Sequence, residues 1–440
     1  MPPSVHTTRL AWGGDLPAAR AACGMGFVST PELGHEAIAL GVGALARLAH
    51  RGGLDADGKS GDGAGLLIQV PHRLLGGRFA VVSLFEWDER ARPLVEQHVQ
   101  VHDWRAVPID ADSLGEMARA SMPRIWHGLV ANPGLDGDEW QRRLYLARRR
   151  IERQAEADGV RMYIPSMSSR ALVYKGLMAG TRLADFYLDL RDESCESRLA
   201  VFHQRYSTNT MPDWRLAQPF RMLAHNGEIN TITGNRAWMK AREADLEPDL
   251  RGAIWRDGSD SASLDNALEL LVQRGWEVSE ALMSLVPDAW EGRGDLAAPV
   301  RDFFRYQSIR FEPWDGPAAL AFSDGVVVGA ALDRNGLRPL RWQRTRQGIV
   351  AAASEAGVVP WPPRTSSSVA ALDQARCCSS TRATARCCAP PRRRSAPHRA
   401  TTTACWPTAC WCRWNATTSS STRWTTWRPS RRCTAGASRT

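Results

Sequence analysis

The sequence predicts an α+β protein built on antiparallel sheets. Apolar runs typical of strands occur near both ends of residues 23–360, and helical periodicity dominates the middle. The alternating strand and helix units of a parallel sheet do not recur. Hydrophobic residues make up 43% of the 440 residues, which is enough to form a substantial core.

The expected elements follow in chain order. Apolar residues at helical spacing (Ile38, Val42, Leu45, Leu48) predict a helix within 34–53 that closes on glycines. Strands are expected at 64–71, 78–87, 162–167, 171–178, 198–207, within 318–342 and at 348–354. Further helices are expected at 139–158, 235–246, 260–275, 279–285 and 299–308, whereas 222–235 is expected to be a loop.

Residues 361–440 differ in composition from the rest of the chain. They contain fourteen arginines and one acidic residue, Asp373, so the formal charge of +9 leaves residues 1–360 mildly acidic. Their eight cysteines include CC pairs but no CxxC spacing, so we assign no metal site to them. A basic arm that binds nucleic acid is one interpretation.

A frameshift is the interpretation of this tail that we favour. GC-rich coding DNA read out of frame yields Arg, Ala, Pro, Ser, Thr, Cys and Trp in abundance, which is the composition seen here. Residues 363–386 can be written in codons whose alternative frame encodes an ordinary alternation of apolar runs and turns. We therefore predict that 361–440 is a frameshifted, disordered tail.

The first 22 residues lack the apolar run of a secretory signal or a membrane span. The tripeptide AAC, which ends at Cys23, vaguely resembles a lipoprotein cleavage box, so lipid attachment is an alternative. Outside the tail only Cys23 and Cys195 remain, too few for a disulfide framework. We expect a cytoplasmic protein without a membrane partner.

One motif is rejected on its context. Residues 53–60, GLDADGKS, match the phosphate-loop pattern, but they follow an expected helix and lead into a strand. The acidic side chains of Asp55 and Asp57 would also repel a phosphate.

Two polar clusters are candidates for a site. Arg205, in HQRYST at the end of an expected strand, has the side chain that binds a carboxylate with two parallel hydrogen bonds. In HNGEIN, the amide of Asn226 and the backbone N–H of Gly227 could converge on an oxyanion. The alternatives are a surface cation, an Asn-Gly turn and structural histidines at His203 and His225.

Cys23 is ambiguous by itself, because a lone cysteine is usually a small buried hydrophobic residue. If the Ala22–Cys23 bond is cut, the freed α-amino group, with a pKa near about 7.7–8.0, can act as general base for the thiol of the same residue. Residues 1–22 are then a propeptide whose removal the chemistry requires.

Together, CGMGF, HRGGLDADGKSGDGAG, FHQRYSTNTMPDWRLAQPFRMLAHNGEINTITGN, SDSASLD and DRNGLRPLR resemble the amidotransferase domain of the glutamate synthase large subunit. That domain is a class II, N-terminal-nucleophile glutamine amidotransferase. The resemblance runs from about Cys23 to about Pro360. It implies a four-layer αββα sandwich with two antiparallel sheets, and the hydrolysis of L-glutamine to glutamate and ammonia.

The resemblance also implies catalytic roles. Cys23 is the nucleophile and its own amine the base, while Asn226 and Gly227 form the oxyanion hole. Arg51, in the HRG motif, steadies the loop beside Cys23.

For substrate binding, the resemblance assigns the α-carboxylate of glutamine to Arg205 and its α-amino group to Asp260. His225 is grouped with these substrate-binding residues. Asp265, on the same expected helix, competes with Asp260 for its role.

In the intact enzyme, the resemblance implies transfer of ammonia to a flavin domain that makes glutamate from 2-oxoglutarate. That domain binds FMN and an iron–sulfur cluster and works with a small NADPH-oxidising subunit. A truncated chain of this kind is expected to hold at most the glutaminase part, with no cofactor and without full synthase activity. The electron donor, NADPH or ferredoxin, and the oligomeric state stay open.

Overall fold

The computed structural model describes residues 23–54, 57, 59–205, 212–255 and 257–360, and the backbone of four strands within 361–440. The predicted propeptide, 1–22, lies outside the described residues. Within the described ranges, no helix has the length and apolar character needed to cross a membrane.

A seven-stranded antiparallel sheet has the first strand of the chain at its centre, in the order β14-β12-β13-β1-β8-β2-β7. Its strands are β1 (Gly24–Gly34), β2 (Ser60–Gln69), β7 (Ala171–Met178), β8 (Ser197–Gln204), β12 (Leu340–Thr345), β13 (Val350–Ala353) and β14 (Ser366–Leu372).

A six-stranded sheet has the order β16-β15-β17-β11-β10-β9. Its strands are β9 (Leu223–Gly227), β10 (Ala318–Ser323), β11 (Val327–Leu332), β15 (Cys378–Thr381), β16 (Thr384–Cys387) and β17 (Ala409–Arg413). All its pairs are antiparallel except β15 with β17.

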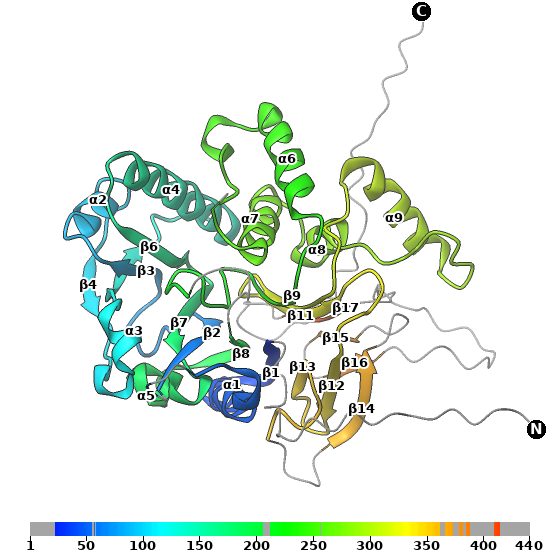
Figure 1. Cartoon of the computed structure of the whole chain (residues 1–440), viewed down its shortest axis with the longest axis horizontal. Helices are drawn as coiled ribbons and strands as arrows, with labels where there is room; N and C mark the ends of the chain where they lie inside the picture. Colours follow the sequence, from blue (N-terminus) through cyan, green and yellow to red (C-terminus); the bar gives the residue numbers. More distant parts are fainter. Residues whose placement is uncertain are drawn as a thin grey trace, which may run out of the picture.

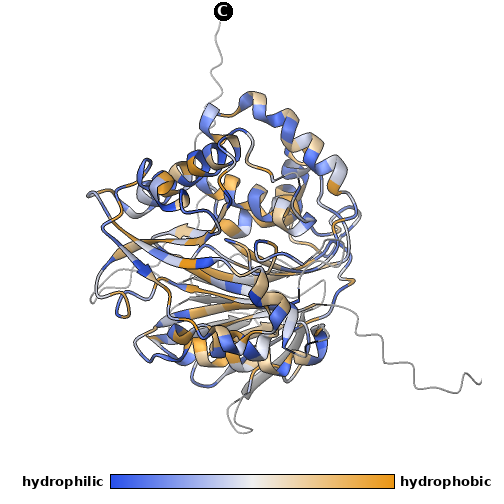
Figure 2. Cartoon of the chain, turned by 60° about the vertical axis from the view of Figure 1, so that its left-hand side comes forward, coloured by the Kyte–Doolittle hydropathy of each residue, from blue (hydrophilic) through white to orange (hydrophobic). Residues whose placement is uncertain are grey.

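These two sheets stack face to face between helices (Figures 1 and 2). The core between them combines apolar residues of both sheets, among them Phe27, Leu67, Val201, Ala321 and Val328. Helix α1 (Glu36–Arg47) covers the outer face of the seven-stranded sheet. The outer face of the six-stranded sheet is covered by α6 (Ile232–Arg242), α7 (Asp260–Gln273), α8 (Val278–Leu285) and α9 (Ala298–Arg310). The predicted αββα sandwich with two stacked sheets is confirmed.

A third, four-stranded antiparallel sheet was not predicted. It has the order β4-β5-β3-β6 and consists of β3 (Phe79–Glu86), β4 (Asp103–Ala106), β5 (Arg124–Ala131) and β6 (Met162–Ser168). Helices α2 (Ala91–Glu96) and α4 (Gly137–Ala157) pack on it, and the short helices α3 (Glu116–Ala120) and α5 (Leu183–Phe186) lie nearby in the chain. The strands expected at 78–87 and 162–167 therefore belong to a separate sheet.

One expectation about the site region was wrong, and one strand there was not predicted. The segment 222–235, expected to be a loop, contains strand β9 and the start of α6. The five residues of β9 become a strand by pairing with β10, about ninety residues later in the chain. Strand β1 was also missed, because its sequence, GMGFVSTPELG, is rich in residues that disfavour strands. At Gly26 an added Cβ would lie 2.3 Å from the carbonyl oxygen of Ala352, which explains why this position has no side chain.

The predicted boundaries and the frameshift of the tail stay predictions. The structure describes strand backbone at four places within 361–440, including β14, which pairs with β12.

Candidate active site

Cys23 lies directly before β1, at the end of the central strand of the seven-stranded sheet. Gly24, the first residue of β1, pairs with Gln204, the last residue of β8. This antiparallel pairing brings Cys23, which precedes β1, close to Arg205, which follows β8. On the other side, the backbone of Met25 exchanges hydrogen bonds with Ser354, which follows β13. The sheet therefore fixes the position of Cys23 from two neighbouring strands.

The thiol of Cys23 is in an environment that opposes its ionisation. The residue is 8% exposed, and burial raises the pKa of the thiol to about 11, partly offset by the positive charges of Arg205 and Arg338. A thiol with that pKa is protonated at neutral pH, so nucleophilic attack requires a base.

Strand β9 brings Asn226 and Gly227 to Cys23, across two hundred residues of sequence. The amide Nδ2 of Asn226 donates a 2.6 Å hydrogen bond to the carbonyl oxygen of Cys23. Its Oδ1 is buried and has no hydrogen-bond partner among the described residues. Gly227 has φ 152°, and an added Cβ there would lie 1.8 Å from the carbonyl oxygen of Pro317, so this position requires glycine.

Arg205 is held in a strained conformation beside Cys23. Its φ is 83°, a region that residues with a side chain rarely adopt. Its backbone N–H donates to the carbonyl of Gly63 at 2.7 Å, and its Nε lies 3.0 Å from Asp62 Oδ2. The GDGAG segment thus positions this arginine. The neighbouring residues 206–211 of the HQRYST motif lie outside the described residues.

His225 and Asp260 belong to one hydrogen-bonded chain. Ser261 Oγ donates to Asp260 Oδ1 at 3.3 Å and lies 2.7 Å from Nδ1 of His225. Burial lowers the pKa of His225, so its ring is neutral at pH 7, and its Nε2 has no hydrogen-bond partner among the described residues. The carboxylate of Asp260 also accepts the backbone N–H of Ile229 at 2.8 Å. Both residues therefore lie at the end of β9, near Asn226.

The contacts of His203 indicate a structural role. Its Nε2 donates to the carbonyl oxygen of His225 at 3.1 Å, it is fully buried, and burial lowers its pKa to about 3.

Asp265 anchors the other end of β9. It is fully buried, and its Oδ1 accepts the backbone N–H groups of Met222 and Leu223 at 2.8 and 3.2 Å. Burial, together with the negative charge of Glu269, raises its pKa to about 6. These contacts leave Asp260, rather than Asp265, at the end of β9 that faces Cys23.

The raised pKa of Asp265 predicts a pH-dependent stability. Between about pH 4 and 6 the native state holds a proton that the unfolded state releases, so Asp265 makes the protein less stable as pH rises through this window. Asp265→Asn keeps an oxygen acceptor without the charge. From pH 4 to pH 7, we expect its free energy of unfolding to rise by about 1–2 kcal/mol relative to the unaltered chain.

Denaturant unfolding at pH 4, 5, 6 and 7 measures this difference. The matched control is Asp112→Asn, since the Asp112 side chain is 91% exposed. Parallel pH profiles for the Asp265 variant and the unaltered chain would contradict the prediction.

Arg51 forms an ion pair with Glu355. Its guanidinium donates to Glu355 Oε2 at 2.7 and 3.1 Å. Glu355 follows Ser354, which is hydrogen-bonded to the backbone of Met25. The ion pair between Arg51 and Glu355 therefore connects the HRG segment to the backbone near Cys23.

Arg338 is a residue of this region to which sequence reasoning gave no role, although the motif DRNGLRPLR was noted. The positive charge of its guanidinium lowers the pKa of both Cys23 and His225. It therefore lies within electrostatic reach of both.

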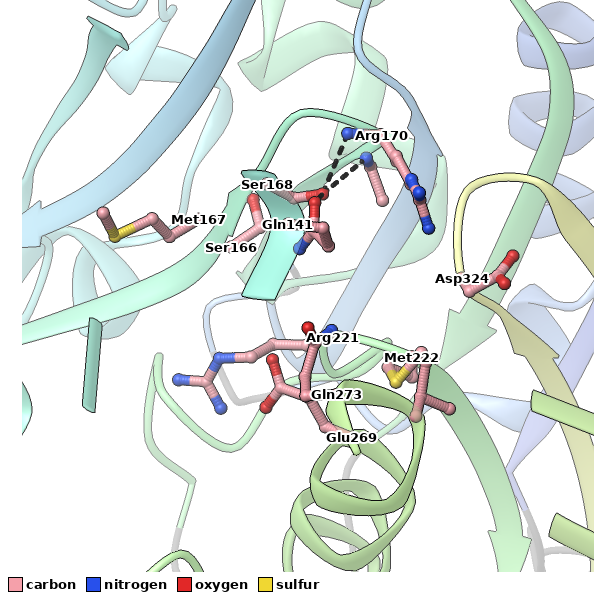
Figure 3. A pocket seen from close by; sticks show the side chains of 12 residues that line it. Gln141, Ser166, Met167, Ser168, Arg170, Arg221, Met222, Glu269, Gln273 and Asp324 are labelled. Atoms are coloured by element: carbon pink, nitrogen blue, oxygen red, sulfur yellow. Dashed lines mark hydrogen bonds between the residues drawn. The ribbon is translucent and has the colours of Figure 1, made fainter. Parts of the chain in front are cut away.

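A small pocket of about 30 Å³ lies apart from these residues (Figure 3). Three of its charged side chains form ion pairs: Arg221 with Glu152 at 2.8 Å, Glu269 with Arg148 at 2.5 Å, and Arg170 with Asp138. The fourth, Asp324, accepts the backbone N–H groups of Val326 and Val327. The hydroxyl of Ser168 accepts the backbone N–H of Arg170. Within the part of the chain that the structure describes, no group of three or more His, Cys, Asp or Glu side chains could hold a metal ion.

Comparison with known proteins assigns the family. The family model described as "Glutamine amidotransferases class-II" matches residues 23–89 and 86–373. This chain belongs to the class-II glutamine amidotransferases. The match to this amidotransferase family begins at Cys23, and it gives no support to the nucleic-acid-binding alternative.

The amidotransferase chain is similar to curated glutamate synthases. It is 43% identical over 382 residues to ferredoxin-dependent glutamate synthase 2 of Synechocystis sp., covering 78% of this chain and 24% of the relative. It is 40% identical over 373 residues to the glutamate synthase [NADPH] large chain of Azospirillum brasilense, covering 77% of this chain and 25% of the relative. The chain thus spans about a quarter of the length of these relatives.

Among solved structures, the amidotransferase chain matches glutamine phosphoribosylpyrophosphate amidotransferase from B. subtilis with a TM-score of 0.35 and 15% identity, over 76% of this chain and 42% of that one.

Proposed function

We propose that this chain hydrolyses L-glutamine to glutamate and ammonia, with Cys23 as the nucleophile. One observation supports the proposal above all: the buried Cys23 directly precedes β1, and β9 brings the amide of Asn226 within 2.6 Å of the carbonyl oxygen of the same residue. The family match, which begins at Cys23, agrees with this assignment.

Removal of residues 1–22 supplies the base. Because burial raises the pKa of the thiol to about 11, a neutral amine close by is needed to take its proton. Cleavage of the Ala22–Cys23 bond frees an α-amino group with a pKa near about 7.7–8.0, attached to the same residue. This group can accept the thiol proton at neutral pH.

The reaction then proceeds in two stages. The sulfur of Cys23 attacks the side-chain carbonyl carbon of glutamine, and the amide nitrogen leaves as ammonia after taking the proton from the α-amine. Water then hydrolyses the resulting thioester, which releases glutamate. We assign stabilisation of the oxyanion in both stages to Asn226 Nδ2 and the backbone N–H of Gly227.

Charged side chains at the strand ends are proposed to hold the substrate. Arg205 offers a guanidinium to the α-carboxylate, and Asp260 a carboxylate to the α-ammonium group. The lone pair on Nε2 of neutral His225 is a second acceptor for that group. We propose that Arg51 acts indirectly, through Glu355, by fixing the backbone beside Cys23.

In a longer protein, we propose that the ammonia is transferred to 2-oxoglutarate. We propose that FMN and an iron–sulfur cluster are held by other parts of that longer protein. The relatives' names include both ferredoxin and NADPH, so the electron donor is not assigned. The cytoplasmic location stays a prediction.

The proposal is tested with the full chain. Mass spectrometry of the purified protein is expected to show Cys23 as the first residue, and glutamate and ammonia are expected in equal amounts from L-glutamine. D-glutamine is the control substrate, because its α-carboxylate and α-amino group are exchanged in space. A correctly cleaved, folded protein that releases no ammonia would overturn the proposal.

A further inference from the structure

Strand β9 lies at the edge of the six-stranded sheet, where β10 is its neighbour on one side. In such a strand, the N–H and carbonyl groups of successive residues point alternately to the paired side and to the free edge. Ala318 lies opposite Gly227, but its own N–H and carbonyl are both bonded to Asp333, on the far side of β10. The next N–H of the chain, that of Glu228, points to the paired side and donates to Pro317 at 3.0 Å. The N–H of Gly227 therefore points to the free edge of β9.

Two residues earlier on the same free edge, the backbone of His225 is bound by the side chain of Gln218. The N–H of His225 donates to Gln218 Oε1 at 2.7 Å, and Gln218 Nε2 donates to the carbonyl oxygen of His225 at 3.4 Å. His203 Nε2 donates to the same carbonyl at 3.1 Å. Because a backbone N–H can only donate, one orientation of the Gln218 amide satisfies both bonds. A side-chain amide thus makes the two bonds that a neighbouring strand would make.

Gln218 is held in place by the chain that returns into β9. The N–H of Phe220 donates to the carbonyl oxygen of Leu223 at 2.9 Å, so residues 218–220 run beside the start of β9 in the opposite direction. On the other side, Gly65 of β2 approaches so closely that an added Cβ would lie 2.6 Å from the carbonyl oxygen of Gln218. The Gln218 residue is 1% exposed. Its side chain therefore has a fixed place beside His225.

We propose that Gln218 is a positioning residue for the oxyanion hole. Its amide fixes the backbone of His225, which is followed directly by the two assigned donors, Asn226 and Gly227. It occupies the free edge of β9 only as far as the carbonyl of His225, which leaves the next donor on that edge, the N–H of Gly227, for the oxyanion. Donors that are fixed before the reaction stabilise a developing charge most strongly. The inference rests on the proposed function, because it concerns the oxyanion hole of that reaction.

The test replaces Gln218 by methionine in the full chain. Gln218→Met nearly keeps the length and volume of the side chain but removes both hydrogen bonds to His225. We expect kcat for L-glutamine to fall about 10- to 100-fold, because displaced donors stabilise the oxyanion less well. KM should stay within about threefold, since the charged groups of the substrate are assigned to Arg205 and Asp260.

Iodoacetamide alkylation of Cys23 distinguishes this effect from general damage to the site. Alkylation forms no oxyanion, so its rate in Gln218→Met should stay within about twofold of that in the unaltered chain. The matched control is Gln307→Met, which removes an equally buried amide from α9 and should leave kcat within about twofold. An unchanged kcat in Gln218→Met, an equal fall in its alkylation rate, or an equal fall of kcat in Gln307→Met would overturn the inference.

Hydrogen exchange in the unaltered chain tests the placement of Gln218 even if the variant does not fold. The N–H of His225 is expected to be protected at least about 10-fold more than that of Gly227, because Gln218 binds the former. Equal protection of the two would contradict the inference. If this difference is seen but the unaltered chain releases no ammonia, the proposed function fails and the pairing of Gln218 with β9 stands. If ammonia is released and Gln218→Met keeps its kcat, only the role of Gln218 fails.

Discussion

Replacement of Cys23 by alanine is expected to reduce glutamine hydrolysis by about 10⁴- to 10⁶-fold, because it removes the atom that forms the bond to the substrate. The fold should survive, since alanine fits wherever a buried cysteine packs as a small apolar residue. Ammonia release under saturating glutamine measures the loss, and circular dichroism checks the fold.

Cys195→Ala is the matched control. Cys195 is also buried and also a thiol, but its contacts in the described structure are structural: its carbonyl accepts a 2.9 Å hydrogen bond from His35, and its N–H donates to Asp192. The glutaminase activity of the Cys195→Ala variant should stay within about twofold of that of the unaltered chain. If activity survived Cys23→Ala but was lost in Cys195→Ala, the nucleophile would be Cys195, and the assignment to Cys23 would be wrong.

Replacement of Gly227 by alanine is expected to damage both stability and activity. The new Cβ would overlap the backbone oxygen of Pro317, 1.8 Å away, in a backbone conformation that alanine rarely adopts. Relief of this overlap must move β9 away from β10, and with it Asn226. We expect a loss of about 3 kcal/mol or more in unfolding free energy and a Tm lower by at least about 5 °C. Ammonia release should fall by at least about 100-fold.

Gly234→Ala controls for the change from glycine to alanine. Gly234 lies within α6, and an added Cβ there meets no described atom within 4 Å outside its own helix backbone. Alanine in a helix interior is favoured by about 0.5–1 kcal/mol, so this variant should be as stable as the unaltered chain or more so. Equal melting temperatures for the two variants would show that the overlap at Gly227 is relieved without cost.

Local sequence signals predicted most helices and the strands with long apolar runs. The strand expected at 171–178 coincides with β7, and the helix expected at 139–158 with α4 within two residues at each end. Strands β1 and β9 were missed because neither has a local strand signal, and both form through partners far away in the sequence. Among the strands that were not predicted, β1 and β9 are the ones that bring Cys23 and Asn226 together.

Site residues could be proposed from residue type, but their arrangement could not. The affinity of an arginine for carboxylates singled out Arg205, yet its strained backbone and its pairing with Asp62 required the structure. Arg338 lies in the motif DRNGLRPLR, which contributed to the family resemblance, but the sequence suggested no chemical role for this residue. The effect of its charge on the pKa of Cys23 depends on how the fold arranges segments that are far apart in the sequence, and no spacing within the motif indicates that.

The central place of β1 has a consequence for the lifetime of the enzyme. New chain ends usually fray, and exopeptidases digest such ends. Here the end created by cleavage before Cys23 would continue at once into a strand paired on both sides, with β8 and with β13. An aminopeptidase would have to strip the middle strand out of its sheet to remove the first residue. The same pairing that aims the nucleophile thereby protects it from being trimmed away.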